Sequence, residues 1–176
     1  MSQVTIARPK ADEHAEFYTR YVTLVPDGDL IALLRDQVID TAALLREVGA
    51  ERANYAYAPG KWTIKQVLGH MTDVERVMSY RALWFARNDS ADLPGFDEDK
   101  WAVSANHSSR TLEDLFEEFQ IVRAATIQFA KHVDAAASVR RGKANGQELS
   151  VRALLYIIAG HERHHGAVLR ERYLTS

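Results

Sequence analysis

Near the end of the chain, residues 151–169 read VRALLYIIAGHERHHGAVL. Apolar side chains fill most of this run, but imidazoles interrupt it at His161, His164 and His165. At about 100° per residue, His161 and His165 lie about 40° apart, in the middle of the apolar stripe of one helix. His164 falls about 60° to the other side of His161, at the margin of the stripe. The stretch therefore predicts a buried helix with two histidines one turn apart on its packed face.

The spacing of His161 and His165 allows both side chains to reach one metal ion, because residues four apart stack on the same face of a helix. Burial of an imidazole costs free energy unless each ring nitrogen finds a partner, and an apolar core supplies none. The alternative is a pair of core histidines bonded to backbone groups or to water. Two histidines on one buried face favour the metal.

The same residues match the H-E-x-x-H pattern of zinc proteases, in which Glu162 would be the general base. Those enzymes usually take a third ligand downstream of the motif. Only 11 residues follow His165, and they contain no His or Asp. Their one carboxylate, Glu171, is too close on the same helix to swing back easily. A third ligand from an upstream helix is the better interpretation, and peptide cleavage that depends on Glu162 would contradict it.

Composition predicts one globular domain spanning residues 1–176, since 47% of the residues are hydrophobic and a chain of this length can bury a core. The formal net charge is −2 and the pI is about 6.4, without a basic block, so we expect no nucleic-acid partner. The chain has no cysteine, so His, Asp or Glu must hold any metal and a cosubstrate must bring any thiol. No stretch approaches 18 apolar residues and no signal peptide is evident, so we expect a soluble cytoplasmic protein without membrane contact.

Four amphipathic stretches predict four long helices, each with a polar cap at its start. The first runs from about Leu30 to a stop at Gly49, and the second begins at about Ile64. The expected caps are Asp29, the capping-box pair Thr63 and Gln66, Thr111, and Ser150.

The connections between these helices are long. Residues 1–28 are expected to contain a short helix with Phe17, Tyr18 and Tyr21. Residues 88–110 predict a lid or a partly helical crossover with an exposed His107, and residues 135–149 a turn-rich link or small hairpin. Because no run alternates like a strand, the predicted fold is an all-α, up-down four-helix bundle with a short N-terminal helix and long crossover loops.

His70 is expected at the edge of the buried stripe of the second helix, about 80° from its centre. A lone histidine at such an edge is more often a surface residue than a ligand. However, the pair on the last helix needs a third protein ligand, and His70 is the histidine best placed to supply it. Metal sites in helix bundles are built from side chains of facing helices that project inward, which this trio would do.

The chain carries, in this order, GKWTI (60–64), LGH (68–70), Asp73, ER (75–76), YRA (80–82), GFDE (95–98) with Trp101, VRAAT (122–126), Gly142 with NG (145–146), and AGHERHH (159–165). This series resembles the DinB-like (DinB/YfiT) superfamily, in particular its branch of short single-domain proteins. The resemblance covers nearly the whole chain, which makes it much more specific than any one motif.

The resemblance implies an up-down four-helix bundle with a divalent metal, usually Ni²⁺ or Zn²⁺, held by His70, His161 and His165. It also implies a homodimer. Relatives are thiol-dependent S-transferases and isomerases that use bacillithiol or mycothiol, and others are assigned as metal-dependent hydrolases. The family name, which comes from DNA-damage inducibility, does not imply DNA binding. Aromatic residues could supply the dimer surface, although some of them must cover the protein's own core, and the candidates are Tyr18, Tyr21, Trp84 and Phe85.

The function expected from these observations is that of a metal-dependent thiol S-transferase or hydrolase acting on a small molecule. Three neutral imidazoles leave a divalent cation its full charge, so that it can activate a thiol or water near neutral pH. Glu162 and Asp73 are the candidate catalytic residues, as proton acceptors or as partners that orient a ligand, although either could be a surface carboxylate in an ion pair. Arg81 and Arg123 could bind an anionic substrate group or form helix-face salt bridges.

Two other functions stay open. The protein could be a non-catalytic metal-binding or stress-response interaction protein, whose coordination sphere is filled by protein and whose fold collapses without metal. It could also be a metal-free helical interaction module with hydrogen-bonded core histidines. The enzyme hypothesis instead predicts a pocket beside the metal and a fold that survives chelation.

Overall fold

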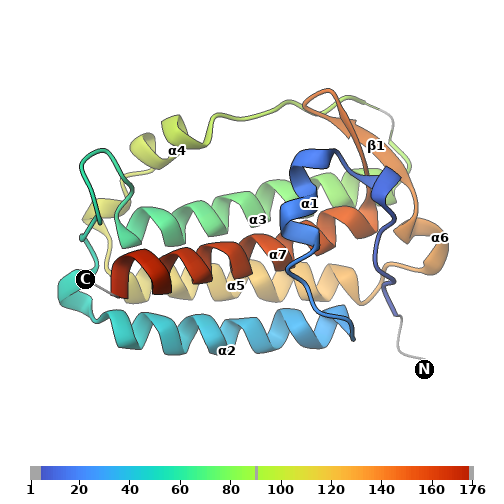
Figure 1. Cartoon of the computed structure of the whole chain (residues 1–176). Coiled ribbons are helices and arrows are strands. Elements are labelled where there is room, and N and C mark those ends of the chain that lie inside the picture. Colours follow the sequence, from blue (N-terminus) through green and yellow to red (C-terminus); the bar gives the residue numbers. More distant parts are fainter. Residues whose placement is uncertain (1–4, 90, 175–176) are drawn as a thin grey trace.

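The computed structural model describes residues 5–89 and 91–174 and consists mainly of helices (Figure 1). Four long helices lie side by side, α2 (Leu30–Val48), α3 (Ile64–Ala86), α5 (Leu112–Ala130) and α7 (Val151–Leu169). The short helices are η1 (Ala11–Glu13), α1 (Glu16–Val22), η2 (Ala50–Arg52), α4 (Glu98–Ser104), η3 (His107–Ser109), α6 (Ala135–Ser138) and the π-helical η4 (Arg170–Leu174). The predicted all-α four-helix bundle is confirmed.

Each long helix begins where its polar cap predicts. The Thr63 hydroxyl accepts a hydrogen bond from the backbone N–H of Gln66 at 3.2 Å, and the Gln66 side chain accepts one from the Thr63 N–H at 2.9 Å. This reciprocal pair satisfies two N–H groups that have no partner within the helix. The other three long helices start at the side-chain caps Asp29, Thr111 and Ser150.

The long helices do not alternate in direction throughout. Figure 1 shows that α2 and α7 run one way, whereas α3 and α5 run the other way. Because α3 and α5 are consecutive and parallel, the connection between them, residues 87–111, has to return along the length of the bundle. This segment passes over α3 and contains the short helix α4, so it is the partly helical crossover that the sequence offered as one alternative.

A small hairpin precedes α7. It is one of the two alternatives expected for residues 135–149, a turn-rich link or a small hairpin. Strand β1 (Arg141–Ala144) pairs antiparallel with β2 (Gln147–Ser150), and Asn145 and Gly146 at the turn have φ of 53° and 70°. Positive φ at both turn residues is typical of a tight hairpin turn and suits Asn-Gly. The crossover is tied to this hairpin, because Leu93 N–H donates to the Lys143 carbonyl at 2.9 Å.

The core consists of two apolar clusters along the bundle with a polar layer between them. On α3, the buried apolar residues from Ile64 to Met71 belong to one cluster, and those from Val74 to Ala86 belong to the other. Buried polar side chains from all four long helices lie between these clusters, and they include Gln37, Thr41, His70, Glu75, Arg123, Thr126, His161 and Glu162. The candidate functional residues therefore gather at one level of the bundle.

One expectation about exposure is wrong, and two of the aromatic candidates for a dimer surface are removed. His107 is buried, and its ring packs so closely on Gly69 that a Cβ there would clash with it. Tyr21 and Phe85 are also buried, so neither can supply a dimer surface, whereas Phe17 and Tyr80 are exposed. These differences arise because short segments outside the four helices cover faces that appear free when each helix is considered alone.

Within the described residues, no helix combines the length and the apolar character that crossing a bilayer requires.

Candidate metal centre

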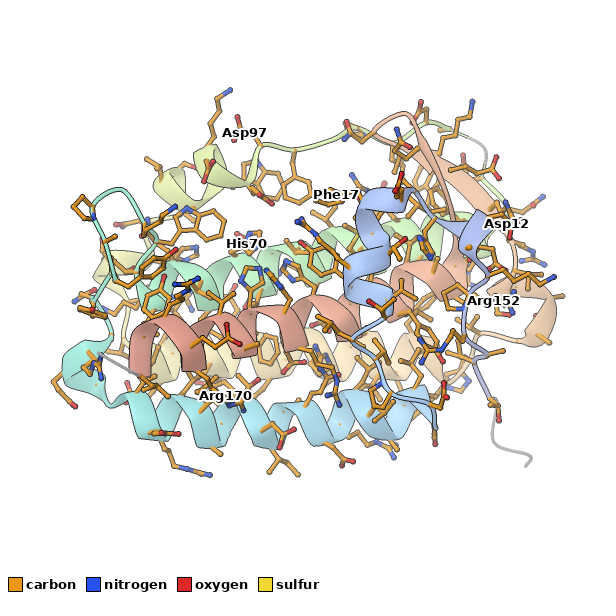
Figure 2. All side chains as sticks on the ribbon, in the orientation of Figure 1. Asp12, Phe17, His70, Asp97, Arg152 and Arg170 are labelled. Atoms are coloured by element: carbon orange, nitrogen blue, oxygen red, sulfur yellow. The ribbon has the colours of Figure 1, made fainter. Side chains whose placement is uncertain are left out.

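Three imidazoles converge between α3 and α7. His70 projects from α3 (Figure 2), and His161 and His165 project from α7. The Nε2 atom of His161 lies 3.1 Å from Nε2 of His70 and 3.1 Å from Nε2 of His165. Potential ligand atoms of the three side chains all lie within 4.8 Å of one another. The structure thus brings together the three histidines that the sequence singles out.

Hydrogen bonding alone explains this arrangement poorly. A nitrogen of a neutral imidazole is either a donor or an acceptor, so Nε2 of His161 cannot donate to one neighbour and accept from the other. Nitrogens bound at about 2.1 Å to one tetrahedral or octahedral cation lie about 3.0 to 3.4 Å apart. Both measured separations, 3.1 Å, fall in this range. The donor set therefore fits a divalent cation.

The surroundings keep the three imidazoles neutral. Burial, aided by the neighbouring imidazole of His164, lowers the pKa of His70 to about 4. Burial also lowers the pKa of His165 to about 3, with a smaller contribution from the imidazole of His70. For His161 burial is again the main cause, and its pKa is well below the ordinary value. Their nitrogen lone pairs are therefore free to bind a cation at neutral pH.

Aromatic rings and a close helix contact position the ligands. The Trp62 ring lies 4.6 Å from the His70 ring between centroids, and the Tyr21 ring meets His161 edge-on at 5.3 Å. Tyr21 can reach His161 because α1 packs directly on α7 at Gly160. A Cβ at Gly160 would clash with the carbonyl oxygen of Tyr21. The glycine in the middle of α7 therefore admits the backbone of α1 beside the site.

His164, the third histidine of the motif, is not part of the trio. It is half-buried, and its ring packs edge-on against Tyr21 at 5.5 Å between centroids. Burial lowers its pKa, and the positive charge of Arg20 adds to this shift.

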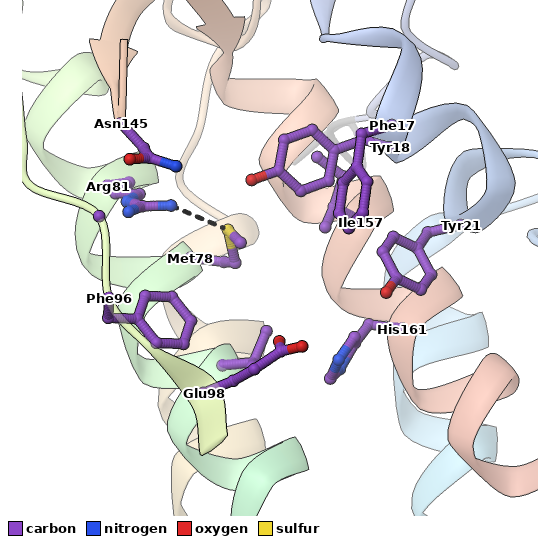
Figure 3. A pocket seen from close by; sticks show the side chains of 12 residues that line it. Phe17, Tyr18, Tyr21, Met78, Arg81, Phe96, Glu98, Asn145, Ile157 and His161 are labelled. Carbon is purple, nitrogen blue, oxygen red and sulfur yellow. Dashed lines mark hydrogen bonds between the residues drawn. The ribbon is translucent and has the colours of Figure 1, made fainter. Parts of the chain in front are cut away.

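A cavity of about 180 Å³ opens beside His161 (Figure 3). One wall is aromatic and belongs to α1, with Phe17, Tyr18 and Tyr21. Phe96 and Glu98, from the crossover and the start of α4, line the opposite wall. The remaining lining residues come from α3, α7, the crossover and the hairpin turn, and they are Val74, Met78, Arg81, Gly95, Asn145 and Ile157.

Glu98 is a candidate functional residue that the sequence analysis missed. Its carboxylate projects into the cavity at the end where His161 and Tyr21 lie (Figure 3). Burial raises the pKa of Tyr21, and the negative charge of Glu98 adds to that shift. In the sequence Glu98 is one residue of an acidic turn. Nothing local shows that the crossover folds back over α3 and brings this residue to the site.

Glu162 faces away from this cavity, toward α2 and α5. The Thr41 hydroxyl donates to its Oε1 at 2.6 Å, and Nη1 of Arg123 forms an ion pair with its Oε2 at 2.7 Å. Arg123 also donates to both carboxylate oxygens of Glu75, each at 2.8 Å. These contacts favour a role in fixing α7 beside its neighbours. The catalytic role of Glu162 stays a prediction.

Asp73 lies on α3 one turn beyond His70 and is half-buried. Arg76 pairs with it at 3.5 Å, and burial is the main cause that raises its pKa. Among the hydrogen bonds of the described residues, none joins Asp73 to a histidine of the trio. It instead lines a neighbouring groove of about 350 Å³, together with Tyr80 and Trp101. Its catalytic role also stays a prediction.

Comparison with known protein families identifies the DinB superfamily, whose model matches residues 33–169. One similar curated protein is the "Putative metal-dependent hydrolase GK0616" of Geobacillus kaustophilus, 27% identical over 140 residues, or 78% of each chain. A protein of the same description from Geobacillus thermodenitrificans is 26% identical over 141 residues, again 78% of each chain.

Two solved structures share the fold. The first is described as "YfiT from Bacillus subtilis is a probable metal-dependent hydrolase with an unusual four-helix bundle topology". It aligns with a TM-score of 0.71 at 14% identity, over 94% of this chain and 90% of that one. The second is a mycothiol-dependent maleylpyruvate isomerase, with a TM-score of 0.67 at 13% identity, over 83% of this chain and 61% of that one. At such identities the likeness concerns the fold alone.

Proposed function

This chain belongs to the DinB superfamily, and from that premise we propose that it is a metal-dependent enzyme whose ligands are His70, His161 and His165. The observation that carries the proposal is the pair of 3.1 Å separations between Nε2 atoms, which suit a shared cation better than hydrogen bonds. Three neutral nitrogen donors suit Ni²⁺ or Zn²⁺. The similar curated proteins carry the name "Putative metal-dependent hydrolase", which agrees with this proposal.

The proposed reaction joins a thiol or water to a small electrophile. A divalent cation with open positions lowers the pKa of a thiol or water and makes either one a nucleophile near neutral pH. The chain has no cysteine, so the thiol would be a low-molecular-weight cosubstrate. The cavity beside His161 would hold the electrophile, and its aromatic wall would limit the access of water.

Within this proposal, Glu98 is the carboxylate best placed to accept a proton. It lines the cavity and is exposed, whereas Glu162 is buried and contacts Thr41 and Arg123. A proton acceptor has to come within hydrogen-bond reach of the group that it deprotonates. Only a side chain that reaches the cavity can meet this condition.

Metal analysis of the purified protein tests the proposal directly. The wild type is compared with the His161→Ala/His165→Ala double variant and with His132→Ala, which removes an exposed histidine just beyond the end of α5. We expect about one Ni²⁺ or Zn²⁺ per chain in the wild type and in the control, and almost none in the double variant. Equal metal content in all three proteins would overturn the proposal.

An activity screen separates the enzyme from a non-catalytic metal-binding protein. The metal-loaded wild type is assayed with bacillithiol or mycothiol and a set of electrophiles, and in parallel with simple esters. Turnover that falls at least about tenfold in Glu98→Gln, while metal content is unchanged, would support the proposed role of Glu98. Bound metal without turnover in any assay would favour the non-catalytic alternative. The homodimer stays a prediction.

A further inference from the structure

Arg81 is a buried cation at one end of the cavity. Its side chain is only 2% exposed. Nη2 donates to the Pro94 carbonyl at 2.8 Å, and Nη1 points to the Met78 sulfur at 3.8 Å, which is a weak acceptor. Among the described residues, none of the ion pairs with an Asp or Glu includes Arg81. The Tyr18 hydroxyl also interacts with the guanidinium, so the partners of this cation within the described residues are neutral groups.

Arg123 is a second buried arginine of the same bundle, and its partners differ from those of Arg81. It is 1% exposed, but two carboxylates, Glu75 and Glu162, lie against it. A buried charge without a counter-ion destabilises the fold, because burial removes its hydration and no opposite charge compensates. Burial lowers the pKa of Arg81, and the nearby Tyr18 hydroxyl only partly offsets this. The difference between the two arginines indicates that Arg81 receives its anion from outside the chain.

The cavity runs from His161, one of the three histidines, to Arg81. On α3, His70, Val74, Met78 and Arg81 follow at spacings of four, four and three residues, which places them within about 80° on one face of the helix. His70 and Arg81 are about 16 Å apart along the helix axis. The contact with Met78 shows that the Arg81 side chain extends back toward the histidines. Other lining residues are apolar, among them Val74, Met78, Phe96 and Ile157.

The two ends of the cavity differ in charge. Figure 3 shows Asn145 beside Arg81 at one end and His161 with Tyr21 at the other, where Glu98 also points. The Tyr18 hydroxyl faces the Arg81 end (Figure 3). Phe96 flanks the guanidinium, with 5.9 Å between its ring centroid and Cζ. The Arg81 end thus offers one positive charge and the neutral polar groups of Asn145 and Tyr18, and Glu98 lies further along. This charge balance favours a singly charged anion over a dianion such as phosphate.

We propose that Arg81 binds the carboxylate of the substrate, and that the substrates are elongated molecules with an apolar body between this carboxylate and a reactive group near the three histidines. The inference rests on the proposed function, because it assigns a substrate class to the same site. It requires that binding depend on the negative charge of the ligand and on the guanidinium.

Calorimetric titration with 4-phenylbutyrate, and with its neutral amide 4-phenylbutyramide, tests this inference. The full-length protein is titrated both loaded with Zn²⁺ and after chelation. In the wild type we expect the carboxylate to bind at least about tenfold more tightly than the amide, and Arg81→Gln to weaken the carboxylate about 10- to 100-fold. The carboxylate affinity of Arg81→Lys should lie between those of the wild type and Arg81→Gln, because lysine keeps the positive charge but cannot donate two parallel hydrogen bonds to a carboxylate.

The matched control is Arg87→Gln, which removes the same charge from an exposed position at the end of α3. It should bind both ligands as the wild type does. Circular dichroism verifies that each variant is folded. If Arg81→Gln does not fold, the ratio of carboxylate to amide affinity in the wild type still tests whether binding depends on the negative charge. A ratio near one overturns the inference.

The outcomes separate this inference from the proposed function. Carboxylate affinity that is equal in the wild type and Arg81→Gln, while Zn²⁺ is bound, would overturn the inference and leave the metal site standing. Affinity that disappears on chelation would mean that the carboxylate binds the metal, which also overturns it. Binding that depends on Arg81 in a protein unable to hold metal would support the inference and contradict the proposed function.

Discussion

Arg123 joins its own helix, α5, to the three other long helices through one side chain. From α5 it donates to Glu75 on α3 and to the Leu34 carbonyl on α2 at 2.9 Å, and it pairs with Glu162 on α7. Burial would lower the pKa of Arg123, but the two carboxylates outweigh it and raise the pKa, which keeps the guanidinium charged. Removing this charge would leave two buried carboxylates without a cation.

We therefore expect Arg123→Met to lower the free energy of unfolding by about 3 to 5 kcal/mol, measured by urea denaturation at pH 7. Arg76→Met is the control, because Arg76 is exposed on α3 and pairs with Glu118 and Asp73. Its loss should cost less than about 1 kcal/mol. Similar small losses in both variants would show that charge does not hold the buried cluster together.

Glu13 is a second buried carboxylate, near the end of the bundle where Arg152 lies (Figure 2). Arg152 donates to both of its oxygens, one of them at 2.6 Å, and the Ser150 hydroxyl donates to it at 2.7 Å. The hydrogen bonds from Arg152 are the main cause that lowers the pKa of Glu13 from 4.5 to about 2, against the opposing effect of burial.

The depressed pKa means that this carboxylate stabilises the fold above its ordinary pKa, and that the stability is lost as the pH falls from about 4.5 to about 2. We expect Glu13→Gln to lower the free energy of unfolding by about 1 to 3 kcal/mol at pH 7, with a smaller difference from the wild type at pH 3. Urea denaturation at both pH values checks this. Glu148→Gln, at an exposed carboxylate paired with Arg141, should behave as the wild type does at either pH.

Helix α1 depends on one glycine for its position. Gly160 lies in the middle of α7, where a Cβ would meet the Tyr21 carbonyl of α1. Gly166, six residues further along α7, has more room, since its Cβ would lie 3.5 Å from the flexible end of Arg170. The two glycines therefore form a matched pair on one helix.

We expect Gly160→Ala to displace α1 and cost about 1 to 3 kcal/mol, which outweighs the better helix propensity of alanine. Gly166→Ala should be neutral or stabilise the protein by up to about 1 kcal/mol. Thermal unfolding gives these differences, and hydrogen exchange of the α1 amides should accelerate only in Gly160→Ala. Equal behaviour of the two variants would mean that α1 does not need this close approach.

The whole bundle is held by two apolar clusters, and the three histidines lie in the polar layer between them. Because each cluster buries side chains from several helices, we expect the helices to persist when metal is removed. A metal that binds only the folded chain adds about 2.7 kcal/mol at a concentration 100 times its Kd.

Zn²⁺ or Ni²⁺ at that excess should therefore raise the Tm of the wild type by about 5 to 10 °C. The His161→Ala/His165→Ala variant should show no such shift, and circular dichroism should show full helicity in the chelated wild type. Loss of the helical signal on chelation would instead support a structural metal, as the non-catalytic alternative requires.

Local patterns in the sequence were sufficient for the helices and for the histidine pair. The caps at Thr63 and Ser150 and the spacing of His161 and His165 depend on groups within about one helical turn of each other, so their geometry follows from the periodicity of one helix. The four amphipathic stretches also predicted a helix bundle, and the family resemblance, which the match to the DinB superfamily confirms, implied the same fold.

Only the tertiary structure decided which separate segments meet at the site. Periodicity within a helix does not tell how residues 87–111 return along the bundle, and this path brings Glu98 to the cavity and buries His107. Likewise, Glu162 and Asp73 could each have faced the metal site, but the positions of the neighbouring helices give them Arg123 and Arg76 as partners. Contacts between distant segments depend on the packing of the whole chain, which no short stretch of sequence contains.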